Sequence, residues 1–140
     1  MTGLVHALLG AGLGGLAGGR WRAFCAGLVS HAVGDAIPHS EMPALLDAAL
    51  TAGVLSVMAL RYGSRSPQVA GALGGLSPDA EHGASKVGLI ADEQKLFPTH
   101  RDGSCVPHGR KTNNHVPQVL LACAGIAVAE LASRRRSSGA

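Results

Sequence analysis

The chain has 140 residues, which is enough for one domain with a modest core. Hydrophobic residues make up 46% of it, but only 15% of its residues are charged, compared with about 25% in a soluble domain, so lipid is expected to replace part of the missing polar surface. The net charge is +3, but aromatic residues make up only 3% and no binding motif accompanies the basic residues, which argues against a nucleic-acid partner.

The first apolar run covers residues 3–19 and is uncharged apart from His6. Gly10, Gly14 and Gly18 recur every four residues, a spacing that lets membrane helices approach closely, within one chain or between chains. The alternative is a flexible glycine-rich segment. Gly10 also begins a match to the dinucleotide fingerprint, but that motif must follow a strand, and no β-rich strand precedes these glycines. We therefore reject a nucleotide site.

The second run, 23–37, ends in a polar motif that contains His31, Asp35 and His39. In a helix, positions i and i+4 share one face, so His31 and Asp35 converge. Pro38 turns the chain, which places His39 just beyond the helix end. A buried imidazole and a buried carboxylate are costly unless they pair or bind a cation. The motif thus predicts half of a metal site, with a private hydrogen-bonded pair as the alternative.

Three further runs complete the chain. The third, 41–60, has Ser40 as its expected N-cap and Asp47 near its start, and the fourth, 67–76, has Ser66 as its N-cap and Pro67 as its first residue. The fourth run is expected to break at the polar cluster 77–83, and the fifth covers 116–133. We predict an all-α fold, a multi-span membrane bundle of about five short apolar helices that forms a single domain over residues 1–133. A polar site loop is expected at 77–115 and a basic disordered tail at 134–140.

Alternating spans place seven arginines on one side of the membrane and the histidine and acidic clusters on the other. By the positive-inside rule the arginine side is cytoplasmic, so the N-terminus lies outside and the C-terminus inside. The second and fourth runs offer only about 15 and 11 residues, whereas a span needs about 20. The fourth run is thus spanning or re-entrant, and a soluble helical bundle remains an alternative. The arginines are Arg20, Arg22, Arg61, Arg65, Arg134, Arg135 and Arg136.

The outer helix ends bring together imidazoles and carboxylates, which suit Zn, Mn or Fe. Their number exceeds one tetrahedral site, so two or more divalent ions are predicted, with Zn favoured. Closely spaced metals activate water and neutralise a phosphoryl oxygen. The candidate ligands are His6, His31, Asp35, His39, Asp47, Asp79, His82, His100 and His108.

Each candidate has a structural alternative. His6 could be a satisfied helix histidine, His39 an exposed turn residue, and Asp47 the cap of a neighbouring helix. Asp79 and Glu81 are the candidate catalytic residues, although Glu81 points away from the Asp79–His82 face and is either solvated or a base. Three loop cations either hold a phosphate or are solvated: Arg101, Arg110 and Lys111.

Four motifs together resemble a known family. They are a histidine in the first run, Ser-His-x-x-x-Asp-x-x-Pro-His at 30–39, Ser-Pro-Asp-x-Glu-His at 77–82, and Phe-Pro-Thr-His with a later Pro-His at 97–108. They resemble the small bacterial inner-membrane proteins described as membrane-bound metal-dependent hydrolases and, more distantly, zinc-dependent phospholipase C-type enzymes. The resemblance implies a bacterial inner-membrane location and a hydrolase site formed by His6, His31, Asp35, His39, Asp79, His82, His100 and His108.

The chain departs from this family after Thr99. The relatives carry His-Arg-Gly-x-Thr-His, whereas Thr99-His100-Arg101-Asp102-Gly103 is followed here by His108. We therefore expect a metal-dependent membrane hydrolase acting on a lipid-borne or membrane-proximal phosphoester. Its expected partners are membrane lipid and, through the glycine-spaced faces, other copies of the chain. The alternatives are a non-catalytic protein whose metals join short helices, and a proton- or ion-handling membrane protein.

Overall fold

The computed structural model describes residues 1–97 and 109–138. The regular secondary structure of this part of the chain is helical, apart from an isolated bridge between His39 and Lys111, so the all-α prediction is confirmed. The elements are α1 (Gly3–Leu16), α2 (Arg20–Ala36), α3 (Ala44–Tyr62), α4 (Pro67–Lys86), the short 3₁₀ helix η1 (Asp92–Gln94) and α5 (Val116–Ser138).

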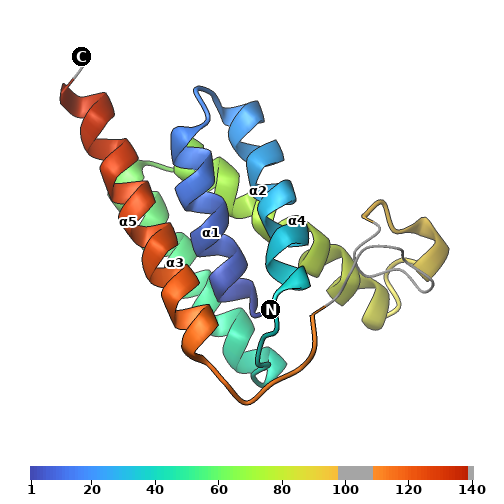
Figure 1. Ribbon diagram of the computed structural model, residues 1–140. Helices are drawn as coiled ribbons and strands as arrows, with labels where there is room; N and C mark the ends of the chain where they lie inside the picture. The colour runs from blue at the N-terminus through green and yellow to red at the C-terminus, as the bar shows by residue number, and fades with distance from the viewer. Residues whose placement is uncertain (98–108, 139–140) are drawn as a thin grey trace.

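Helix α1 lies at the centre, with α2, α4 and α5 packed around it, and successive helices run in alternating directions (Figure 1). Small residues allow this close packing. A Cβ at Gly10 would collide with the Gly71 carbonyl, one at Gly14 would collide with the backbone of α4, and one at Gly27 would also meet Gly71. The glycine-spaced face of α1 is therefore occupied by α4 of the same chain.

The predicted N-cap of the fourth run is confirmed, because the Ser66 hydroxyl accepts a hydrogen bond from the Val69 amide. The predicted cap of the third run is wrong. Helix α3 begins at Ala44, with Pro43 at its N-cap position. Ser40 instead accepts a hydrogen bond from the Gln118 side chain.

Helix α4 does not end at the polar cluster 77–83, as expected, but continues through Pro78 to Lys86. A proline inside a helix removes one hydrogen bond and crowds the carbonyl four residues earlier. That carbonyl belongs to Gly74, which has no side chain to add to the crowding. The consequence is functional: Asp79, His82 and Lys86 are spaced i, i+3 and i+7 and so share one helix face. The polar loop begins after Lys86 rather than at residue 77.

The basic tail is also different from the prediction. Helix α5 extends to Ser138, so residues 134–138 are helical rather than disordered. Arginine favours helices, and its charge interacts well with the C-terminal end of a helix. The Arg136 guanidinium also donates a hydrogen bond to the Gly15 carbonyl near the end of α1.

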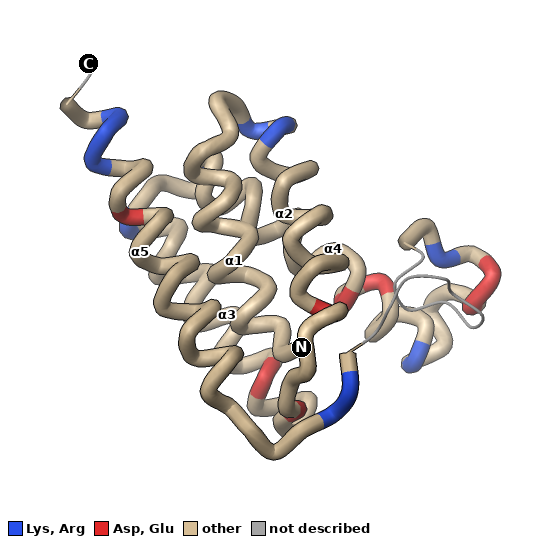
Figure 2. Tube along the Cα trace, viewed as in Figure 1, with Lys and Arg blue, Asp and Glu red and all other residues tan. Residues whose placement is uncertain are grey.

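The arginines carried by the helices gather toward one end of the molecule (Figure 2). The N-terminus of α2 and the C-terminus of α5, which carry arginines, lie at one end, while the acidic residues of α3 and α4 lie toward the other. Two helices of the described chain, α3 and α5, are long and apolar enough to cross a membrane. Only 6% of the most apolar stretch of α3 is buried, whereas the core helix of a soluble protein is mostly buried.

Candidate metal centre

Three of the predicted ligands form a buried cluster between α1 and α2. His6 and His31 are 0% exposed and Asp35 is 1% exposed. His6 Nε2 lies 3.0 Å from Asp35 Oδ1, and His31 Nε2 lies 3.1 Å from Asp35 Oδ2. The two imidazole rings stack with their centroids 3.9 Å apart. The N-terminal ammonium of Met1 also forms an ion pair with Asp35 Oδ1 at 2.9 Å.

Hydrogen bonds fix which ring nitrogen of each histidine carries a lone pair. His31 Nδ1 donates to the Gly75 carbonyl at 2.8 Å, so Nε2 is the nitrogen that can bind a cation. His6 Nε2 donates to Asp35. Its Nδ1 is buried and has no hydrogen-bond partner in the described part of the chain. Both rings therefore offer one nitrogen as a ligand.

The contact between His31 and Asp35 requires a positive charge between the two atoms. In the tautomer fixed by Gly75, His31 Nε2 is a lone-pair atom, and it faces a carboxylate oxygen at 3.1 Å. Two lone-pair atoms at this distance repel unless a proton or a metal ion lies between them. Two ligands of one tetrahedral zinc lie about 3.3 Å apart, given zinc–ligand distances of about 2.0 Å. The observed spacing therefore fits a shared metal, as well as the alternative of a protonated His31.

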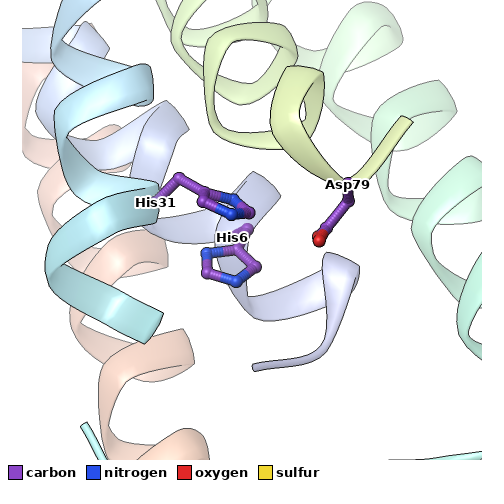
Figure 3. A group of neighbouring side chains, drawn as sticks. All are labelled: His6, His31 and Asp79. Carbon is purple, nitrogen blue, oxygen red and sulfur yellow. The ribbon is translucent and has the colours of Figure 1, made fainter. Parts of the chain in front are cut away.

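Asp79 of α4 brings a second carboxylate to the cluster. One ligand atom each from His6, His31 and Asp79 lie within 4.8 Å of one another, so this group could hold a metal ion. Figure 3 shows the two stacked rings with the Asp79 side chain beside them. Asp79 is only partly buried, so its carboxylate lies at the edge of the buried cluster and reaches the space outside it.

That space is a cavity of about 440 Å³. Its lining combines predicted ligands with cations: His39, Asp47, Asp79, His82, Lys86 and Lys111. Lys111 also pairs with Glu41 at 2.8 Å, and this hydrogen bond lowers the pKa of the Glu41 carboxyl group. The cavity thus offers both carboxylate and ammonium groups to a ligand.

Two other predicted histidine ligands lie at this cavity. His39 is fully buried and donates through Nδ1 to the Ile37 carbonyl at 2.8 Å, which makes Nε2 its ligand nitrogen. His82 differs, because the Lys95 ammonium donates to its Nδ1 at 3.1 Å. The proton of a neutral His82 is therefore on Nε2, and in this arrangement His82 is a hydrogen-bond donor rather than a metal ligand.

Two predicted site residues have structural roles instead. Asp47 accepts hydrogen bonds from the amides of Gly3 and Leu4 at 2.8 and 3.2 Å, so it caps the N-terminus of α1, the alternative left open above. Glu81 accepts hydrogen bonds from the amides of Leu96 and Phe97. Its carboxylate holds the loop after α4 and does not join the His–Asp cluster.

His100 and His108, the last two predicted ligands, lie outside the described residues, as does Arg101. The sequence analysis missed three contributors. No sequence pattern marks the Gly75 carbonyl, because every residue has a backbone carbonyl. Lys86 could have been found from its i+4 relation to His82 once α4 was extended through Pro78. Lys95, which is buried and bonded to His82, lies in a polar loop that seemed solvated.

Comparison with protein-family models, with curated proteins and with solved structures gives no match. The resemblance stated above therefore stays a prediction. The function must be argued from the cluster and its cavity.

Proposed function

We propose that this chain is a multi-span membrane protein of the metal-dependent hydrolase type that cleaves a phosphoester, lipid-borne or close to the membrane. One observation supports this most strongly: a buried His–His–Asp cluster adjoins a cavity lined by lysines. Burying these groups is costly unless they are paired or bind a cation. The Met1 ammonium pairs with Asp35 Oδ1, and a metal ion between His31 Nε2 and Asp35 Oδ2 would compensate the other contact. The cavity gives an anionic substrate access to the same place.

The membrane location draws on the exposed apolar surface. Leucines and valines of α3 are solvent-accessible along the helix, including Leu45, Leu50, Val57 and Leu60. Contiguous apolar surface of this kind indicates contact with lipid or with a partner. The arginine end would face the cytoplasm by the positive-inside rule. The metal centre would then lie at the outer face of a bacterial inner membrane.

The residues have distinct roles in this proposal. His6, His31 and Asp35 would hold one divalent ion and leave a fourth position for water, and His39 would contribute to a second, with zinc the best match to the donor set. A bound divalent ion supplies a Lewis acid for a phosphoryl oxygen and makes water a better nucleophile. Lys86 and Lys111 would bind the phosphate oxygens, and the Nε2–H of His82 would donate to them. Asp79, partly exposed at the cavity wall, would accept the proton of the attacking water.

The test is a hydrolysis assay with the detergent-solubilised protein. A water-soluble nitrophenyl phosphoester and a phospholipid in mixed micelles are offered to protein treated with a chelator and then reloaded with Zn²⁺ or Mn²⁺. We expect turnover that the chelator removes, that metal restores and that His31→Gln abolishes. His115→Ala is the matched control, because His115 is an exposed histidine at the same end that bonds to Ser40 rather than to the cluster.

A non-catalytic metal-binding role is the second candidate, favoured by one observation. The cluster joins α1, α2 and α4 at a buried point, as a structural site does. It predicts tightly bound metal with no turnover on either substrate, together with a loss of thermal stability on chelation. The ion- or proton-handling alternative requires polar residues spread across the membrane depth, whereas the acidic residues of α3 and α4 gather toward one end (Figure 2).

A further inference from the structure

A second cavity lies far from the metal centre. It is an apolar groove of about 500 Å³ between α3 and α5, with Leu8 of α1 at its base. This volume falls within the usual range for ligand sites, about 300–1,000 Å³. Several lining side chains are open to the outside, among them Leu50, Val57 and Ile126. The groove therefore faces whatever surrounds the bundle.

A glycine keeps this groove open. Gly53 lies in the middle of α3, where glycine costs roughly 0.5–1 kcal/mol relative to alanine. It lines the groove, and a Cβ built on it would meet no atom of the described residues within 4 Å. Close packing therefore does not require a glycine here, in contrast to Gly10 and Gly71. The space beside Gly53 is available to a ligand.

The groove ends at a polar junction on the arginine end of the bundle. Glu130 accepts two hydrogen bonds from Arg61, at 3.1 and 2.9 Å, and one from the Tyr62 hydroxyl at 2.8 Å. This carboxylate neutralises Arg61. Tyr62 also lines a basic cavity of about 430 Å³, so the apolar groove and the basic cavity share this side chain.

The adjoining cavity is basic. Arg65 and Arg136 line it together with the hydroxyl-bearing residues Ser66, Ser133 and Ser137. In the described part of the chain Arg65 has no ion pair, and the hydrogen bond of Arg136 goes to a carbonyl, which leaves its charge uncompensated. Two arginines beside serine hydroxyls complement a phosphate group.

We propose that the groove and the adjoining cavity together bind one anionic phospholipid. One acyl chain lies in the groove beside Gly53, and the headgroup phosphate is bound by Arg65 and Arg136. The apolar lining, the wall that the two cavities share at Tyr62 and the uncompensated charge all favour this occupant over a protein segment. The proposal rests on the membrane location proposed above but not on the metal centre, which lies at the opposite end.

Native mass spectrometry of the solubilised chain with added phosphatidylglycerol or phosphatidylcholine tests this proposal. We expect one phosphatidylglycerol per chain to be retained in preference to phosphatidylcholine, with or without a chelator. Arg65→Gln should weaken retention about fivefold, the effect of one cation on an anionic lipid. Gly53→Leu should displace the lipid by filling the groove, and it should not unfold α3 because leucine favours helices.

Matched variants separate these effects from general ones. Arg22→Gln removes the same charge at the same end of the bundle but outside both cavities, and Ala52→Leu adds the same side chain one position away from the groove. Both should retain phosphatidylglycerol as the wild type does. Equal retention of the two lipids would overturn the proposal, as would undiminished retention in Arg65→Gln and Gly53→Leu. Dimers that disappear in Gly53→Leu would overturn it too, because a second copy would then occupy the groove.

Discussion

At the residue scale, the candidate site depends on how each polar group is compensated. Asp35 accepts from His6 and faces His31 across 3.1 Å, a pairing that the i, i+4 spacing of the sequence predicted for His31. His6 was predicted as a ligand because it lies near the outer end of an uncharged run. The role of Glu81 could not be predicted, because its partners are the backbone amides of Leu96 and Phe97, which no sequence pattern marks.

Two carboxylate variants separate a catalytic group from a structural one. We expect Asp79→Asn to lower the turnover of the reloaded protein by at least about 100-fold, as loss of a general base does. Glu81→Gln should change turnover by less than about threefold, because its carboxylate only holds the loop. Steady-state rates at saturating Zn²⁺ measure both. A larger loss in Glu81→Gln than in Asp79→Asn would reverse the two assignments.

At the element scale, glycine and proline determined which predictions succeeded. The Ser66–Pro67 start of α4 was predictable because N-caps have local signatures. The passage of α4 through Pro78 was not, since proline usually ends a helix and only the packing of the bundle overrides that tendency. This one difference moved Asp79 and His82 from a loop onto the helix face that lines the cavity.

Helix packing gives a stability prediction. We expect Gly71→Val to destabilise the protein by at least about 2 kcal/mol, since its Cβ would collide with the Gly10 carbonyl in a contact that cannot relax easily. Thermal unfolding in detergent, followed by circular dichroism, measures the effect. Gly53→Ala is the control, because its Cβ meets nothing within 4 Å, and it should leave the melting temperature unchanged or raise it. Equal melting temperatures for the two variants would contradict the packing described here.

Asp47 offers a second test at this scale. Its carboxylate caps α1 through the Gly3 and Leu4 amides, so Asp47→Ala should cost about 1 kcal/mol of stability and leave the metal content of the folded protein unchanged. Melting curves and elemental analysis of the same sample measure both. Loss of metal at unchanged stability would instead make Asp47 a ligand, as first expected.

At the scale of the whole molecule, the alternating helices separate the arginine end from the metal centre (Figure 2). This arrangement followed from the sequence because the charges mark the ends of the apolar runs. The sequence was a poorer guide to which helices span the membrane. Length and composition support α3 and α5, whereas α1 has only 14 residues and α2 only 17, and both pack closely on α4.

Cysteine labelling tests the orientation. In a background without the native cysteines, Ser64→Cys at the arginine end should react with a membrane-impermeant maleimide only from the cytoplasmic side. Asn113→Cys, at the metal end, should react only from the opposite side. Labelling of both positions from the same side would exclude a spanning arrangement, because the two residues lie at opposite ends of the helices.

The proposed function depends on metal binding by the buried His–His–Asp cluster. The most direct measurement is elemental analysis of the purified, detergent-solubilised protein after incubation with Zn²⁺, Mn²⁺ or Fe²⁺, for the wild type and for a His31→Gln, Asp35→Asn double variant that retains polar groups at both positions. Circular dichroism checks that the variant keeps its helices. We expect two or more ions per wild-type chain and the loss of at least one in the variant. No metal in the wild type, or equal metal in both, would contradict this expectation and leave His31 and Asp35 as a buried ion pair.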